Sequence, residues 1–272
     1  MPALPPLSEP EPVLPDRQAV VAALRAAGCV FAEDEARLLL SSAGTPAELA
    51  VMVERRAAGL PLEQVLGWAE FRGLRIAVDP GVFVPRRRTE FLAGEAARLA
   101  RAGAVVVDLC CGSGAVGAAL AAEVERPLLY AVDIDPAAVA CARRNLAAAG
   151  GVVREGDLYE PLPAELRGRV DVLVANAPYV PTDAVGLLPA EARDHEPRTA
   201  LDGGHDGLDI LRRVTARAPD WLAPGGHLLF ETGERQAAAA VDAVTRAGLR
   251  ARVAASAELH ATVVVGTATP FS

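Results

Sequence analysis

From Gly103 onward, short apolar runs alternate with a turn and an alanine-rich helical stretch, and this alternation constrains the fold more than any other feature of the chain. Continuous apolar strands separated by helices are typical of a parallel sheet that is buried on both faces. Five runs fit the pattern: AVVVDL (104–109), LLYAVD (128–133), GVVREG (151–156), DVLVANA (171–177) and HLLFETG (227–233). Two more, ARVAAS (251–256) and ATVVVG (261–266), follow without an intervening helix, which predicts an antiparallel hairpin at the edge of the sheet. The sequence therefore predicts an α/β fold.

Upstream of this region the pattern changes, and the chain divides into four parts. Residues 1–15 contain six prolines, which predicts a flexible tail. In 16–69, apolar residues recur at spacings of three and four and the segments end at glycine, as expected of a small helical domain. In 70–85, two β-type runs flank Asp79-Pro80-Gly81, which predicts a β-hairpin connector. The α/β domain is then expected at 86–272.

Composition excludes several classes of protein. The chain has 272 residues, of which 51% are hydrophobic and 23% charged, so it can bury a core and wholesale disorder is excluded. A net charge of −8, with no lysine, disfavours a protein that follows long nucleic acids by neutralising phosphates. No apolar run approaches the roughly 18 residues that span a bilayer, and the N-terminus lacks the features of a signal peptide. We therefore expect a cytoplasmic protein without membrane contact.

Neither the cysteines nor the histidines have the spacing of a metal site. The four cysteines include no C-x-x-C pair, and the four histidines are scattered. Asp202, Asp206 and Asp209 lie in a glycine-rich loop, but the later glutamate of a calcium-binding loop is absent. We expect no metal and interpret this loop as facing the substrate.

A glycine-rich turn after the first strand of the alternating region indicates a nucleotide-type cofactor. Gly112 and Gly114 would let a ligand approach the backbone closely. A dinucleotide site would place a pyrophosphate at the start of the next helix. Here Asp108 precedes the turn, and Cys110 stands where a dinucleotide site has its first glycine. A carboxylate would repel a pyrophosphate, but it suits the ammonium and sulfonium charges of S-adenosylmethionine.

Two further acidic residues follow the next two strands. Asp133 ends the second strand, where a carboxylate can take both ribose hydroxyls, and Asp157 follows the third, where it can accept from the adenine amino group. Their neighbours Ile134 and Leu158 complete this part of the expected cofactor site. Domains that bind NAD or FAD share the general outline. The three acidic strand ends favour S-adenosylmethionine, with S-adenosylhomocysteine as its product.

The segment Asn176-Ala177-Pro178-Tyr179 follows the fourth strand and indicates the chemistry. It differs by one residue from Asn-Pro-Pro-Tyr, which methyltransferases use on planar NH₂ groups. Because the lone pair of such a nitrogen is delocalised, two acceptors that hold its hydrogens are needed to aim it at a methyl carbon. The Asn176 side-chain oxygen and the Ala177 carbonyl are the predicted acceptors, with Asn176 also beside the cofactor. Tyr179 offers a flat wall, and Pro178 stiffens the turn.

With these motifs in place, the chain resembles the HemK/PrmC-type protein-(glutamine) methyltransferases from about residue 55 to residue 240. Four segments carry the resemblance besides the turn and the catalytic motif: RRAAGLPLEQVLGWAEF (55–71), VPRRRTE (84–90), EPRTALDGGHDGLDILRR (196–213) and PGGHLLFETGERQ (224–236). The resemblance implies a class I, Rossmann-like S-adenosylmethionine-dependent methyltransferase with a seven-stranded sheet. It also implies that the N-terminal helical domain helps to grip a protein substrate.

The family methylates the side-chain amide of the glutamine in the Gly-Gly-Gln motif of peptide-chain release factors, which implies a release factor or a related protein as partner of a monomeric enzyme. The substrate-binding residues that the resemblance implies are Arg86, Thr89, Glu90, Tyr179, Glu196 and Pro197.

The sequence departs from the family pattern at Ala177, which replaces a proline, and at SAELHATVVVG (256–266), where the usual C-terminal signature is missing. Alanine keeps the backbone carbonyl that the chemistry needs. Two other functions remain open: methylation of another planar amine, on adenine or on a small molecule, and cofactor binding without catalysis.

Overall fold

The computed structural model describes residues 16–269, which fall into two compact units divided between Leu66 and Gly67. The tail predicted at 1–15 lies outside the described residues. Within the described range, no helix is long and apolar enough to cross a membrane.

The first unit is a small helical bundle. It contains α1 (Arg17–Ala26), α2 (Ala32–Ser42), α3 (Pro46–Ala57) and α4 (Leu62–Leu66). Helix α3 begins as its sequence predicts, because the Thr45 hydroxyl accepts from the Glu48 N–H at 3.1 Å and Pro46 occupies the first turn. The core of the bundle is apolar, with Leu24, Leu39 and Leu49 fully buried.

A charged pair also lies inside this bundle. The Arg56 guanidinium donates to both oxygens of Glu35, at 2.6 and 3.1 Å, and both residues are buried. Arg56 also donates to the Leu60 carbonyl at 3.0 Å. This geometry satisfies two charges that would otherwise be costly to bury.

The second unit contains a seven-stranded sheet with the order β5-β4-β3-β6-β7-β9-β8. Its strands are β3 (Val105–Leu109), β4 (Leu128–Asp133), β5 (Val152–Glu155), β6 (Val170–Ala175), β7 (Leu222–Thr232), β8 (Arg250–Ser256) and β9 (Ala261–Thr267). The first five strands are parallel, and β9 runs antiparallel between β7 and β8. The predicted α/β fold and its antiparallel edge are confirmed.

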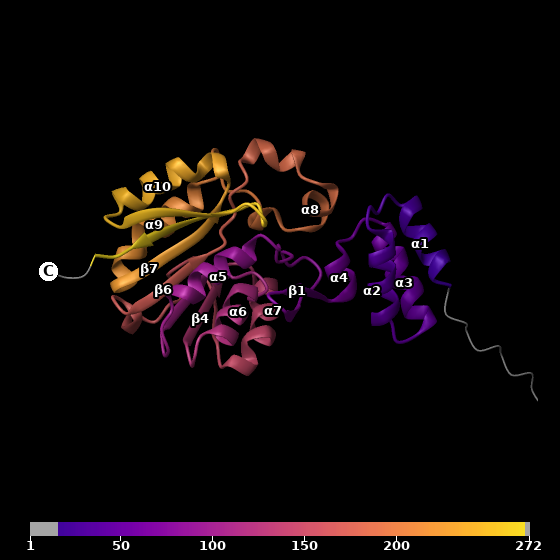
Figure 1. Ribbon diagram of the computed structural model, residues 1–272, viewed down its shortest axis with the longest axis horizontal. Coiled ribbons are helices and arrows are strands. Elements are labelled where there is room, and N and C mark those ends of the chain that lie inside the picture. Colours follow the sequence, from indigo (N-terminus) through magenta and orange to yellow (C-terminus); the bar gives the residue numbers. More distant parts are fainter. Residues whose placement is uncertain (1–15, 270–272) are drawn as a thin grey trace, which may run out of the picture. The chain divides into compact units, whose positions relative to one another are not determined.

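Helices cover both faces of this sheet (Figure 1). They are α5 (Thr89–Leu99), α6 (Ala115–Glu123), α7 (Pro136–Leu146), α9 (Asp209–Trp221) and α10 (Ala237–Arg246). Helix α8 (Ala190–His195) packs against the 3-10 turn η3 (Thr182–Leu187), and the other short 3-10 turns are η1 (Ala147–Ala149), η2 (Ala164–Leu166), η4 (Arg198–Ala200) and η5 (Glu234–Gln236). Successive strand residues pack into opposite cores: Val106 belongs to the core under α5, α6 and α7, and Val107 to the core under α9 and α10. This alternation explains the continuous apolar strands.

The predicted hairpin exists, but its turn lies elsewhere. Strands β1 (Trp68–Phe71) and β2 (Leu74–Ala77) pair around Arg72 and Gly73, whose φ angles are +49° and +73°. Two positive φ angles define the tight turn that matches strand twist, so this dipeptide closes the hairpin. The prediction of a turn at Asp79-Pro80-Gly81 is confirmed, because the Val82 N–H donates to the Asp79 carbonyl, but the prediction that this turn closes the hairpin was wrong, since it follows β2.

The strand predicted at 227–233 also begins earlier than its apolar run. Residue Leu222 already pairs with Val170, and the register shifts before His227 pairs with Val172. This irregularity accommodates the two glycines Gly225 and Gly226.

The buried pair of the helical unit gives a first prediction. Glu35→Ala removes the carboxylate from a buried guanidinium, so we expect this unit to lose about 3–5 kcal/mol of unfolding free energy. Hydrogen exchange of the α2 and α3 amides would measure the loss. Glu33→Ala is the matched control, because its partner Arg25 is exposed and such pairs contribute about 1 kcal/mol or less. Equal losses in the two variants would contradict the prediction.

Candidate active site

The carboxyl ends of β3, β4, β5 and β6 surround a cavity of about 290 Å³. Of the residues predicted to bind a cofactor, eight line it: Asp108, Cys110, Gly112, Asp133, Ile134, Asp157, Leu158 and Asn176. Gly114 does not. It caps α6 with a φ of +78°, and a Cβ there would lie 3.2 Å from the Cβ of Ala142. Its role is close packing of helix α6 on α7.

The turn after β3 leaves the cavity open beside its backbone. Cys110 and Gly112 have φ angles of +54° and +53°, and a Cβ built on Gly112 meets nothing within 4 Å. The Gly112 N–H donates to Asp133 Oδ2 at 2.8 Å, and the Asp135 N–H donates to Oδ1 at 3.0 Å. Each Asp133 oxygen thus keeps acceptor capacity for a ligand.

Asp108 is buried at the floor of this cavity. Its Oδ2 accepts from the Gly117 N–H at 2.9 Å. Burial raises the pKa of Asp108 to about 7, although the Gly117 hydrogen bond opposes the shift, and the negative charge of Asp133 adds to it. Burial also raises the pKa of Asp133. Burial disfavours the charged forms of Asp108 and Asp133, and a nearby positive charge would offset this cost. These two carboxylates therefore favour a cationic ligand.

Asp157 lines the same cavity together with an arginine that sequence analysis missed. The Arg213 Nη2 lies 2.5 Å from Asp157 Oδ2, and Arg213 is itself part of the lining. Arg213 comes from α9, 56 residues further along the chain. Its helical position gave no signal that it would face the end of a distant strand.

A second, smaller cavity of about 30 Å³ lies on the other side of the Asn176–Tyr179 segment. All four residues of the segment line it, but Tyr179 does not line the larger cavity. Five residues line both: Phe83, Thr89, Asn176, Pro178 and Ala200. The predicted catalytic segment therefore forms the boundary between a cofactor-sized cavity and a small polar one.

Glu231 organises the small cavity, and sequence analysis did not single it out. It is 2% exposed and accepts three hydrogen bonds, from the Tyr179 hydroxyl at 2.6 Å, Arg88 Nε at 2.7 Å and the Thr89 hydroxyl at 2.7 Å. Burial and the adjacent carboxylate raise the pKa of Tyr179, so its hydroxyl stays protonated and donates. The available signal was an acidic residue inside the apolar run HLLFET.

The residues implied to bind substrate are divided between the two cavities, and some of them line neither. Arg86 Nη2 is 2.5 Å from Glu196 Oε2, and Glu196 Oε1 accepts from the Val84 N–H at 3.2 Å. Arg86 lines the small cavity, and Pro197 lines the large one. Glu90 lines neither; its carbonyl accepts from Arg72 Nη1 at 3.0 Å.

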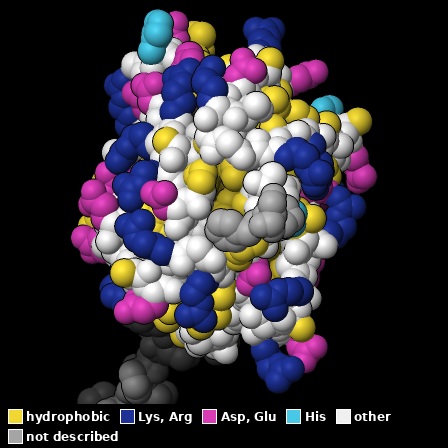
Figure 2. Space-filling model, turned by 90° about the vertical axis from the view of Figure 1, so that its left-hand side faces the viewer, with side chains coloured by type: hydrophobic (Ala, Val, Ile, Leu, Met, Phe, Trp, Pro, Cys, Tyr) yellow, Lys and Arg dark blue, Asp and Glu magenta, His cyan; other side chains and the backbone are white. Residues whose placement is uncertain are grey.

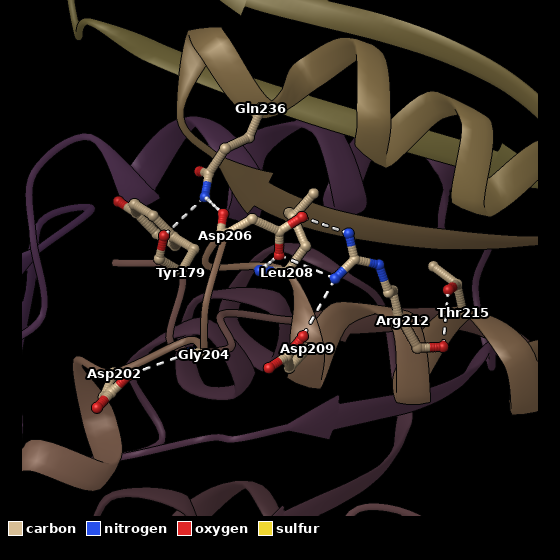
Figure 3. A network of polar contacts seen from close by, with 9 residues as sticks. All are labelled: Tyr179, Asp202, Gly204, Asp206, Leu208, Asp209, Arg212, Thr215 and Gln236. Atoms are coloured by element: carbon tan, nitrogen blue, oxygen red, sulfur yellow. Dashed lines mark hydrogen bonds and ion pairs between the residues drawn. The ribbon is translucent and has the colours of Figure 1, made fainter. Parts of the chain in front are cut away.

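The acidic loop predicted to face the substrate uses all three of its aspartates within the protein, since Asp202 also pairs with Arg198 at 3.1 Å and accepts from the Gly204 N–H (Figure 3). Asp206 and Asp209 both pair with Arg212. Asp202 borders the large cavity and accepts from the Thr182 hydroxyl at 2.6 Å. Among residues 16–269, no group of three or more His, Cys, Asp or Glu is arranged to hold a metal ion.

The buried position of Glu231 gives a second prediction. Glu231→Gln replaces a charged acceptor of three hydrogen bonds by an amide whose NH₂ must face a donor, so we expect a loss of about 2–4 kcal/mol in unfolding free energy. Denaturant unfolding would measure it. Glu234→Gln, on the exposed turn η5, should change stability by about 0.5 kcal/mol or less. A Glu231 variant as stable as this control would refute the role of the cluster.

Comparison with known proteins agrees with this geometry. Residues 73–190 match the Methyltransferase small domain. The crystal structure of a methyltransferase from Pyrococcus furiosus matches with a TM-score of 0.56 at 18% identity, over 79% of this chain and 99% of that chain, which confirms the fold.

Two relatives are more informative because their sequences are closer. A release factor glutamine methyltransferase of Geobacter sulfurreducens is 42% identical over 208 residues, which cover 75% of this chain and 72% of the relative. A 4-amino-L-phenylalanine/4-methylamino-L-phenylalanine methyltransferase of Streptomyces pristinaespiralis is 40% identical over 202 residues, 72% of this chain and 68% of the relative. Because the first similarity extends over most of both sequences, the chain belongs to the release factor glutamine methyltransferase family.

Proposed function

We propose that this methyltransferase transfers a methyl group from S-adenosylmethionine to the side-chain amide nitrogen of a glutamine in a peptide-chain release factor. The observation that carries the proposal is that Asn176 lines both cavities and that Ala177, the next residue, lines the small one. A methyl donor in the large cavity and an amide in the small one would meet at these two residues. The Geobacter relative supports the glutamine of a release factor as acceptor.

The large cavity fits S-adenosylmethionine by the chemistry of its donors. Asp108 would hold the ammonium group, Asp133 the ribose hydroxyls and Asp157 the adenine amino group, with Ile134 and Leu158 as apolar flanks. When bound, this cofactor supplies an electrophilic methyl group on a sulfonium. Burial raises the pKa of the Cys110 thiol, which keeps it neutral as a small lining residue.

The acceptor nitrogen needs help that the catalytic segment is suited to give. The Asn176 side-chain oxygen and the Ala177 carbonyl would accept its two hydrogens, so that the lone pair is aimed toward the large cavity. The new N–C bond would use that lone pair while the bond between the methyl group and sulfur breaks, its electron pair staying on the sulfur of S-adenosylhomocysteine. The nitrogen would then lose one proton to solvent. No strong base is required, since the proton becomes acidic only after the bond has formed.

An arylamine is the second candidate acceptor, and the Streptomyces relative favours it. The flat side chains of Phe83, Pro178 and Tyr179 line the small cavity and suit any planar group. Incubating the protein with labelled S-adenosylmethionine and either recombinant release factors or 4-aminophenylalanine would distinguish the two.

Four features of the biological setting belong to this proposal. We propose that the enzyme acts as a monomer in the cytoplasm, where translation takes place, and that the helical unit at 16–69 helps to bind the protein substrate. We also propose that it binds no extended nucleic acid. In support, arginine and acidic side chains are interspersed on the face of the molecule drawn in Figure 2.

Asn176→Ala tests the role of the catalytic segment. Since holding the amide matters chiefly in the transition state, kcat should fall by about 100-fold or more while cofactor affinity stays within about threefold. Methyl incorporation into the release factor and calorimetry would measure the two quantities. Thr182→Ala, which follows the segment but lines neither cavity, is the matched control. Near-native turnover of the Asn176 variant would overturn the proposal.

Asp108 makes cofactor affinity depend on pH. An ammonium group beside Asp108 lowers the pKa of that carboxyl from about 7, so binding releases a proton and strengthens as pH rises toward 8. The Kd at pH 6 should be about tenfold weaker than at pH 8. Calorimetry in buffers of different ionisation enthalpy would detect the proton. Identical pH dependence in wild type and Asp108→Asn would contradict this assignment.

The same shift affects the protein without cofactor. Because the folded pKa of Asp108 lies above the ordinary value, the folded state binds more protons than the unfolded state between about pH 4 and 7. Stability should therefore fall as pH rises through this window, and less so in Asp108→Asn.

A further inference from the structure

The segment that carries the proposed chemistry has left the sheet and needs other support. Strand β6 ends at Ala175, and the ladder with β7 ends at the same residue. Beyond it, Val180 donates to the Leu201 carbonyl at 3.1 Å and accepts from the Gly203 N–H at 2.8 Å. Thr182 donates to the Gly204 carbonyl at 2.9 Å. The glycine-rich segment 201–208 thus lies directly behind the catalytic segment.

One side chain joins these two segments (Figure 3). The Gln236 Nε2 donates to the Tyr179 carbonyl at 2.9 Å and to the Asp206 carbonyl at 2.8 Å. Its Oε1 accepts from the Gly233 N–H at 3.1 Å. The amide orientation follows from the partners, because both carbonyls can only accept and the N–H can only donate. The amide nitrogen thus donates to two backbone carbonyls, and the amide oxygen accepts from a backbone N–H, with the Thr232 hydroxyl 3.5 Å away.

Two glycines allow the segments to approach this closely. A Cβ on Gly207 would lie 2.3 Å from both the Tyr179 carbonyl oxygen and Gln236 Nε2, and Gly207 has a φ of +77°. A Cβ on Gly203 would lie 2.6 Å from the Pro178 carbonyl oxygen. No other residue type fits either position without displacing the backbone of the catalytic segment.

We propose that Gln236 is a positioning residue of the methyl transfer: its amide fixes the backbone of Asn176–Tyr179 so that the Asn176 and Ala177 acceptors keep the spacing that an NH₂ group requires. The proposal rests on the function proposed above. Neither residue of the acceptor pair touches Gln236 in the hydrogen bonds described, so its effect passes through the Tyr179 carbonyl, two residues after Ala177.

The two ends of Tyr179 explain why this contact matters. Its hydroxyl is held by Glu231 on β7 and its carbonyl by Gln236 at the end of η5. The two anchors follow one another closely in the chain, so the end of β7 fixes both the ring that walls the small cavity and the backbone beside it. A misplacement of about 1 Å at reacting groups can lower a rate about 100-fold.

Two substitutions at Gln236 separate hydrogen bonding from bulk. Gln236→Glu keeps the shape but places a carboxylate against two carbonyl oxygens, so we expect kcat to fall about 10- to 100-fold. Gln236→Ala admits water to the same carbonyls, and a smaller fall, about three- to tenfold, is expected. Cofactor Kd and the KM for the release factor should stay within about threefold in both variants.

Arg212→Met is the matched control. It removes the exposed ion pairs of Asp206 and Asp209 from the same loop and leaves the Gln236 contacts intact. Its kcat should remain within about twofold of wild type. Hydrogen exchange gives a readout independent of the acceptor: the Val180 and Thr182 amides should exchange faster in Gln236→Glu than in Arg212→Met.

Each outcome of these measurements supports or overturns the proposed role of Gln236. The proposal is overturned if Gln236→Glu keeps kcat within about twofold of wild type. It is also overturned if kcat falls only in proportion to losses of thermal stability and of cofactor affinity. If Gln236→Glu does not fold, Gln236→Ala decides by the same criteria. If the wild type methylates no glutamine, the proposed function fails, while the exchange rates of Val180 and Thr182 still decide whether Gln236 fixes the segment.

Discussion

Helices cover both faces of the seven-stranded sheet, and this constraint determines where the protein can place polar chemistry. The strand interiors are apolar on both sides, as Val106 and Val107 illustrate by packing into opposite cores. A polar side chain inside such a strand would lose its water without a compensating partner. Polar groups therefore appear where strands end. The carboxyl ends of parallel strands meet at one edge of the sheet, so Asp108, Asp133 and Asp157 converge although they are widely separated in the sequence.

The segment that follows strand β6 at this edge needs a support other than the sheet. The residues after β6 no longer belong to a ladder, yet the proposed chemistry requires two of their oxygens at a fixed spacing. In place of ladder hydrogen bonds, a short parallel bridge between Val180 and Asp202 and the Gln236 amide hold this segment. The close approach depends on Gly203 and Gly207, which explains why this loop is rich in glycine.

Sequence patterns were sufficient where the information is local. The strands are apolar runs, the turn at 110–114 is marked by its glycines, and the acidic residues stand directly at strand ends. Contacts between distant segments gave no such signal. Arg213 reaches Asp157 from a helix, and Glu231 meets Thr89 across 142 residues. The hairpin shows how local evidence can also mislead.

In that hairpin, Asp79-Pro80-Gly81 has the stronger turn composition, but Arg72-Gly73 closes it. Strand pairing decides between two local candidates, because only a turn after Phe71 places Ile76 opposite Ala69. Both of these side chains are buried, and a shift by one residue would expose them.

The two cavities differ in charge, and this difference fits their proposed occupants. The large cavity contains Asp108, Asp133 and Asp157 against the single charge of Arg213, so it retains a negative excess that suits a cationic cofactor. In the small cavity, Glu231 pairs with Arg88, and Arg86 is neutralised by Glu196. A neutral carboxamide would enter this balanced environment without leaving a charge unpaired. A protonated amine would find no unpaired negative charge there, because Glu231, the carboxylate that lines this cavity, is already paired with Arg88. In the proposed reaction, this charge distribution would direct positive charge to the cofactor side and favour an acceptor nitrogen in the neutral form that a methyl transfer requires.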